Sequence, residues 1–114
     1  AHVTNLLAEG VASNPNGTAI EFMGTKITFS ELNELVQKAA KGLQDQGIGE
    51  GNKVGLFMPN TPYYAVMFMA TASVGATVVN FSPLYNEEEL AAQIVDSDTD
   101  IMATIELNGF FDNR

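Results

Sequence analysis

The sequence contains no cysteine, and its only histidine is His2. The absence of cysteine excludes disulfides, thiolate nucleophiles and cysteine-based metal sites from this chain. One histidine beside the N-terminus does not assemble a convincing Ser-His or Cys-His catalytic pair. We expect His2 to be a solvated residue of the tail, and we predict no nucleophile–base pair in the chain.

Basic residues are scarce as well. The chain has five Lys and Arg against 14 Asp and Glu, which gives a net charge of -9. The five bases form no cluster along the sequence. Because phosphate contacts require grouped Lys and Arg, the composition disfavours both nucleic acid and an anionic membrane surface as partners.

Charged side chains are missing altogether from one long run, between Val54 and Asn86. A membrane-spanning helix needs about 20 consecutive apolar residues that all stay helical. Three prolines and Gly75 interrupt this run, and the residues after Gly75 are rich in β-branched side chains, which favour a strand. The longest helix-compatible piece, residues 62–74, is roughly 20 Å long and too short to span. We therefore expect no transmembrane segment, and a buried helix and strand of a βαβ unit instead.

Hydrophobic patterning predicts helices that alternate with strands along the chain. The expected elements are a helix over 3–13, a hairpin of 18–23 and 26–29 around Gly24-Thr25, a helix over 29–46, a strand over 54–58, a helix over 62–74, a strand over 76–81, a helix over 87–95 and a strand over 101–105. Thr28 and Glu31 have the spacing of a capping box, and Thr61 and Asn86 are placed to cap later helices.

Apolar strands that alternate with helices indicate a parallel sheet built by right-handed crossovers. The predicted fold class is α/β, with an N-terminal β-hairpin and a three-stranded parallel sheet between flanking helices, the beginning of a doubly wound fold. We expect residues 1–114 to form a single domain, because no linker or repeat divides them.

No phosphate-binding or metal-binding motif stands out. The glycine-rich segment 47–51 joins a predicted helix to the following strand, whereas a phosphate loop follows a strand and opens a helix. Asp96, Asp98 and Asp100 alternate as calcium ligands do, but the glycine and the glutamate that complete a calcium loop are missing. We therefore predict no catalytic, cofactor-binding or metal-binding residue in this chain.

Candidate ligand-binding residues come from topology. Ligands of open α/β sheets bind beyond the carboxyl ends of the strands. The candidate substrate-binding residues at those ends are Asn60, Thr61, Asn80, Ser82 and Tyr85. Capping and turn formation are the alternative explanation for these polar residues.

Several segments, in this order, resemble the adenylate-forming superfamily, which includes the acyl-CoA synthetases. The segments are TFSEL at 28–32, GLQDQGIGEGNKV at 42–54, GLFMPN at 55–60, VGATVVNFSPLY at 74–85, EEL at 88–90 and DS at 96–97. The resemblance covers residues 10–104, and Pro-Leu-Tyr at 83–85 is similar to fatty-acid ligases. Asn52 and Ser82 depart from the usual Asp and Asn, both at loop positions that leave the fold expectation intact.

The resemblance implies that this chain is the first part of the large N-terminal AMP-binding domain of a longer ligase. Such an enzyme uses ATP, Mg²⁺ and CoA, and forms an acyl-adenylate and then a thioester. The phosphate loop of the family would follow Arg114, so we expect the 114 residues alone to be structural and inactive, with no cofactor bound. The expected parent activity is that of a fatty-acid–CoA ligase for long- or medium-chain acids.

The expected partner of the chain is the remainder of its own enzyme. An isolated chain would expose an apolar patch and open sheet edges, so we also expect self-association. The patch is expected around Met67, Phe68, Val78 and Phe81.

Two alternatives stay open. The first is a portion of an adenylation domain that loads an amino or aryl acid onto a carrier protein. The second is a small non-enzymatic α/β interaction module. The absence of a recognisable signal peptide favours a cytoplasmic location, and peripheral membrane association of the complete enzyme is a further alternative.

Overall fold

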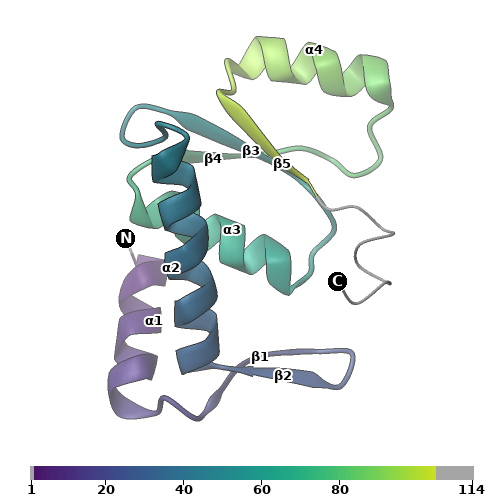
Figure 1. The fold of residues 1–114 in the computed structure, drawn as a ribbon. Coiled ribbons are helices and arrows are strands. Elements are labelled where there is room, and N and C mark those ends of the chain that lie inside the picture. Colours follow the sequence, from purple (N-terminus) through teal and green to yellow (C-terminus); the bar gives the residue numbers. More distant parts are fainter. Residues whose placement is uncertain (1, 105–114) are drawn as a thin grey trace.

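The computed structural model describes residues 2–104, in which helices and strands alternate along the chain (Figure 1). The elements are α1 (His2–Ser13), β1 (Thr18–Phe22), β2 (Thr25–Thr28), α2 (Phe29–Asp45), β3 (Lys53–Phe57), α3 (Pro62–Ser73), β4 (Thr77–Asn80), α4 (Glu87–Ser97) and β5 (Ile101–Thr104). Their order and type confirm the predicted α/β fold class, and the boundaries agree with the predicted ones to within two residues. Ile105, the predicted last residue of the final strand, lies outside the described residues.

Three parallel strands form the central sheet in the order β4-β3-β5, so the first of them lies in the middle. Helices α2 and α3 lie on one face of this sheet and α4 lies on the other (Figure 1). The chain steps from β3 to β4 in one direction and then crosses β3 to reach β5 in the other. Because both crossovers are right-handed, the two connecting helices fall on opposite faces.

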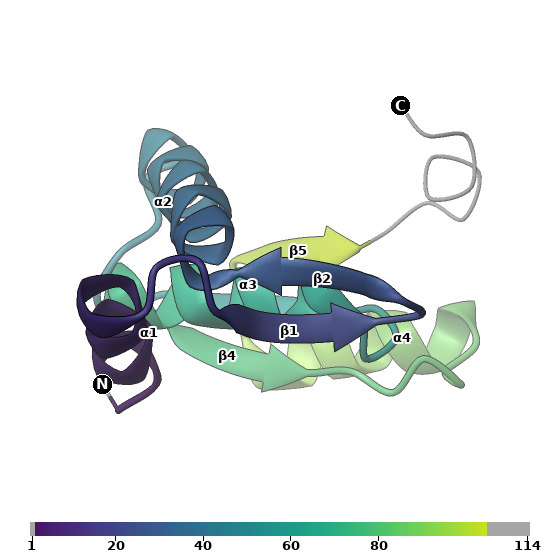
Figure 2. The same ribbon diagram turned by 90° about the horizontal axis from the view of Figure 1, so that it is seen from below.

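The hairpin of β1 and β2 is a separate antiparallel sheet, on the far side of α3 from the central sheet (Figure 2). Its loop consists of Met23 and Gly24, because Phe22 pairs directly with Thr25. The prediction that Gly24 and Thr25 form the turn is wrong by one residue. Both loop residues have a positive φ, 51° and 84°, as two-residue turns that match the right-handed strand twist require.

Helix α2 begins at the predicted capping box. The Glu31 amide donates to Thr28 Oγ1 at 3.1 Å, and the Thr28 amide donates to Glu31 Oε1 at 2.9 Å. Gly47, just past the helix, has the left-handed φ of 82° expected there. The side chains that α2 buries come from one face, which packs against α3, and they are Leu32, Val36 and Leu43.

Helix α3 begins at Pro62, where a missing amide costs nothing because the first turn has no acceptor for it. Thr61 occupies the N-cap position, but its side chain makes no capping hydrogen bond, so the prediction of a side-chain cap is wrong. The Tyr64 amide, which a capping side chain would use, donates instead to the Thr61 carbonyl at 3.0 Å. Thr61 Oγ1 is left buried and without a partner among the described residues.

Strand β3 is the centre of the apolar core. Val54 and Leu56 are 0% and 1% exposed, and both point toward α2 and α3, with whose buried side chains they form one cluster. No helix within residues 2–104 is both long and apolar enough to cross a membrane. The charge-free run instead builds β3, α3 and β4, the elements that fill this core.

On the opposite face of β3, the side chains of Phe81 and Met102 cover Gly55. A Cβ atom at Gly55 would lie 2.5 Å from Phe81 Cε1 and closer still to the Met102 sulfur, so only glycine lets these side chains meet over the strand. Phe81 is consequently 3% exposed, and the prediction that it belongs to an exposed apolar patch is wrong. Met67, Phe68 and Val78 are half-buried.

Candidate functional site

A pocket of about 480 Å³ opens where β3 and β4 end, and we call it the strand-end pocket. Its lining comes from the residues after β3, the first turn of α3 and the residues that end and follow β4: Met58, Pro59, Asn60, Tyr64, Asn80, Phe81, Ser82 and Pro83. The strands are parallel and Leu56 lies opposite Asn80, so their carboxyl ends meet at one edge of the sheet. This is the edge where ligands of open α/β sheets bind.

The floor of the strand-end pocket is apolar and rigid. Met58 and Phe81 are buried, and the Phe81 amide donates to the Leu56 carbonyl at 3.0 Å, which continues the sheet pairing past the end of β4. The Tyr64 ring stacks on Phe68 one helical turn away, with ring centroids 6.2 Å apart. These contacts fix the Tyr64 ring against the side of the pocket.

A hydrogen bond crosses the pocket wall between α3 and β4. The Tyr64 hydroxyl donates to Asn80 Oδ1, joining the first turn of the helix to the last residue of the strand. The lining also holds the Asn60 amide and the Ser82 hydroxyl. It therefore offers neutral donors and acceptors above an apolar floor, with no carboxylate, amine or imidazole among its members.

Ser82 opens a tight turn after β4. Its Oγ accepts from the Leu84 amide at 3.2 Å, and its carbonyl accepts from the Tyr85 amide at 3.1 Å. Asn86 then caps α4, with its Oδ1 accepting from the Glu89 amide at 2.8 Å. These bonds confirm the predicted cap and fix the path of the chain as it leaves the pocket.

The structure brings three of the five candidate residues together in the lining: Asn60, Asn80 and Ser82. Thr61 and Tyr85 are half-buried neighbours that do not line the pocket. Sequence reasoning missed Tyr64. Its position in the first turn of a helix that follows a strand was the available signal, because such a turn lies over the end of the next parallel strand.

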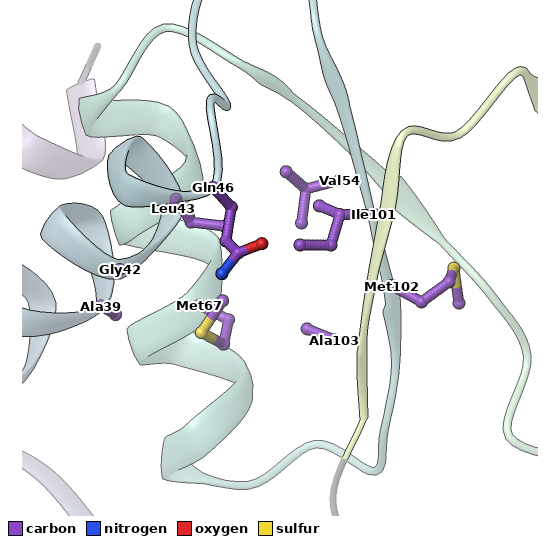
Figure 3. A pocket seen from close by; sticks show the side chains of 9 residues that line it. All are labelled: Ala39, Gly42, Leu43, Gln46, Val54, Met67, Ile101, Met102 and Ala103. Atoms are coloured by element: carbon purple, nitrogen blue, oxygen red, sulfur yellow. The ribbon is translucent and has the colours of Figure 1, made fainter.

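A second cavity, of about 250 Å³, lies between α2, α3 and the face of β5 (Figure 3). Leu43, Met67 and Val54 supply apolar walls from three different elements, and the Gln46 side chain points into the space. The Gln46 amide is the one hydrogen-bonding side chain in this lining. The lining of this cavity therefore provides apolar contacts and one neutral hydrogen-bonding group.

The Asp100 side chain, in the turn between α4 and β5, binds a backbone amide. Asp100 Oδ2 accepts from the Lys53 amide at 2.7 Å, which ties β5 to the start of β3. Within residues 2–104, no three His, Asp or Glu side chains gather closely enough to hold a metal ion.

Some known proteins are similar to this chain in sequence. A long-chain-fatty-acid–CoA ligase of Bacillus subtilis is 33% identical over 90% of this chain and 18% of its own length. An acetyl-coenzyme A synthetase of Vibrio parahaemolyticus is 40% identical over 68% of this chain and 12% of its own length. The chain thus spans less than a fifth of the length of these relatives.

Solved structures share the architecture at lower identity. An artificially fused adenylation–PCP di-domain from Klebsiella oxytoca matches with a TM-score of 0.83 at 21% identity, over 93% of this chain and 20% of that one. A Mycobacterium tuberculosis fatty acyl CoA synthetase matches with a TM-score of 0.82 at 23% identity, over 90% of this chain and 21% of that one. At these identities the likeness concerns the fold alone.

The family described as AMP-binding enzyme matches residues 7–112, nearly the whole chain. The match confirms the resemblance carried by the segments between residues 28 and 97. This chain belongs to the AMP-binding enzyme family.

Proposed function

We propose that this chain is the N-terminal part of the large AMP-binding domain of an AMP-forming ligase that joins a fatty acid to coenzyme A. The observation that carries the proposal is the 33% identity to the Bacillus subtilis long-chain-fatty-acid–CoA ligase over 90% of this chain. The Pro-Leu-Tyr segment at 83–85, which is similar to fatty-acid ligases, supports the same proposal.

The reaction implied for the complete enzyme has two steps. A carboxylate oxygen of the acid attacks the α-phosphorus of ATP, pyrophosphate leaves, and an acyl-adenylate forms. The thiol sulfur of coenzyme A then attacks the acyl carbon, and AMP leaves with the bonding electron pair. Mg²⁺ accompanies ATP in this chemistry, but the described residues do not gather a set of ligands for it. The phosphate loop that the resemblance implies would follow Arg114, and we assign the metal and the phosphates to that part of the enzyme.

The contribution of this chain is one wall of the substrate site. Asn60, Asn80 and Ser82 supply hydrogen-bonding groups above the apolar floor of the strand-end pocket. Thr61 and Tyr85 shape the backbone beside it, through the first turn of α3 and the turn before α4. The 114 residues alone are proposed to be inactive, so pyrophosphate exchange by the isolated chain would contradict this assignment.

The partner of the chain is proposed to be the rest of its own enzyme, and for the isolated chain a second copy. The apolar cavity beside β5 and the edge position of β5 within the described sheet support this (Figure 3). Light scattering of the isolated chain should give a mass above that of one copy, and a strictly monomeric mass at high concentration would contradict it. A cytoplasmic location is part of the same proposal.

An aryl or amino acid is the second candidate substrate. Its support is a 4-coumarate–CoA ligase of Oryza sativa, 31% identical over 71% of this chain, and a VinN structure with L-aspartate at 26% identity. The coarse activity is the same in both cases, and only the acid differs.

Pyrophosphate exchange separates the candidates. The full-length protein that contains this chain would be assayed with hexadecanoate, octanoate, acetate, 4-coumarate and L-aspartate, each with ATP and with coenzyme A added afterwards. We expect the fastest exchange with a fatty acid and a thioester product by mass spectrometry. Fastest exchange with 4-coumarate or aspartate would replace the fatty acid, and no exchange with any acid would remove the ligase proposal.

A further inference from the structure

We propose that Asn80 binds an acceptor group of a substrate in the strand-end pocket, and that Tyr64 is the positioning residue that aims its amide. The inference rests on the proposed function for the identity of the substrates. It rests on geometry for the residues, because Tyr64 and Asn80 face each other across the pocket wall from α3 and β4.

The hydrogen bond fixes which end of the Asn80 side chain faces the helix. Because the Tyr64 hydroxyl donates to Oδ1, the nitrogen of the same amide is turned away from Tyr64 with both N–H groups unused. Among residues 2–104 this nitrogen has no hydrogen-bond partner, and Asn80 is exposed in the lining. A free asparagine amide rotates between two orientations, and this bond selects one of them.

The donor is itself held in place. The Tyr64 ring stacks on Phe68 with 28° between the planes. The backbone amide of Tyr64 donates to the Thr61 carbonyl. The Asn80 backbone is fixed opposite Leu56 in the sheet. Both side chains are therefore anchored on rigid elements, which is the arrangement that a preorganised binding group needs.

The chemistry of the ligand follows from the lining. Two N–H donors select an oxygen acceptor, and the buried Met58 and Phe81 below them select an adjacent apolar segment. In the proposed ligase this shared chemistry occurs in the carboxylate of a fatty acid and in the amide carbonyls of coenzyme A. Steady-state kinetics can tell these two sources apart.

Two substitutions in the full-length protein isolate the donors from the positioning bond. Asn80→Asp keeps the acceptor for Tyr64 but replaces both N–H donors with an oxygen. Tyr64→Phe keeps the donors but removes the bond that aims them. Asn16→Asp, at an exposed position in the turn before β1, adds the same charge away from all the pockets described and serves as the control.

We expect Asn80→Asp to raise KM for one substrate at least about tenfold, and Tyr64→Phe to raise the same KM about two- to fivefold. The value of kcat, the other two KM values and the melting temperature should stay near those of Asn16→Asp. A raised KM for the acid identifies the carboxylate as the ligand, and a raised KM for coenzyme A identifies its amides. Unchanged KM values, or a loss of kcat that parallels a loss of thermal stability, would overturn the inference.

The failure of the proposed function would be visible separately. A wild-type protein that ligates no acid refutes the ligase, whatever the variants do. The binding claim is then decided by calorimetry with octanoate, coenzyme A and ATP as probes. Octanoate or coenzyme A binding the wild type at least about tenfold more tightly than Asn80→Asp supports it. Equal affinities, no binding to the wild type, or a difference for ATP alone overturn it.

Discussion

The side-chain amide of Asn52 donates to the Asp100 carboxylate across 3.3 Å, joining the turn before β3 to the turn before β5. Asn52 Oδ1 at the same time accepts from the Gly49 amide at 2.8 Å. Asn52 thus uses both ends of its amide. An aspartate at this position could serve only as the acceptor.

Asn52→Asp should therefore lower the free energy of unfolding by about 1 kcal/mol, since it removes a donor and places two carboxylates side by side. Urea denaturation followed by circular dichroism would measure this. The reversed pair, Asn52→Asp with Asp100→Asn, removes the like charges. Because Asp100 Oδ2 also accepts from the Lys53 amide, the double variant should recover only part of the loss. Equal stabilities of the single and double variants would contradict the pairing.

Gly55→Ala should destabilise the chain by about 1–3 kcal/mol, because the new methyl group must displace Phe81 and Met102 on the α4 face of the sheet. Gly42→Ala is the matched control. A Cβ at Gly42 meets nothing within 4 Å, and alanine is the better helix former, so this change should stabilise by about 0.5–1 kcal/mol. Thermal unfolding of the two variants should shift in opposite directions, and shifts of the same sign would refute the argument.

Met23→Asn should stabilise the hairpin by about 0.5–1 kcal/mol. Met23 is 85% exposed and holds a φ of 51°, a conformation that asparagine tolerates better than methionine. Amide exchange of the β1 and β2 residues would report the change locally. Gly24→Ala is the opposite control, because its φ of 84° makes any side chain strained, and it should speed the same exchange.

Thr71→Val should change the free energy of unfolding by no more than about 0.5 kcal/mol. Thr71 is fully buried, and its hydroxyl donates to the Met67 carbonyl at 2.7 Å, which already accepts a helix hydrogen bond. Valine has the same shape and removes only the second bond. Thr71→Ala, which leaves a cavity, should cost about 1–2 kcal/mol, and a larger cost for valine than for alanine would contradict this view.

The sequence was sufficient for elements whose local chemistry agrees with their packing. Thr28 and Glu31 satisfy each other within one turn, so their spacing alone identified the start of α2. Pro62 fixed the start of α3 for the same local reason. The predictions were wrong where a second hydrogen-bond acceptor or a second turn position lay next to the predicted one. The Tyr64 amide, which was expected to donate to the Thr61 hydroxyl, donates to the Thr61 carbonyl instead. The hairpin turn lies one residue earlier than predicted, at Met23 and Gly24, whose positive φ values suit the twist of the strands.

The site was harder to predict, because its decisive contact joins residues that the sequence keeps apart. Asn60, Asn80 and Ser82, named by the rule about strand ends, line one pocket, and their role in binding substrate stays a prediction. The rule gave no information on Tyr64, whose hydroxyl reaches Asn80 because the first turn of α3 lies beside the end of β4. The burial of Phe81 was missed for a related reason, since it depends on the absence of a side chain at Gly55.

The strand order β4-β3-β5 has a consequence for synthesis on the ribosome. The central strand ends at Phe57, but its second neighbour is complete only at Thr104. One edge of β3 therefore stays without its partner until residues 58–104 have been translated, about 2–10 s at roughly 5–20 residues per second. During that interval the nascent chain displays its most deeply buried strand with an open edge, and pairing with β5 closes that edge.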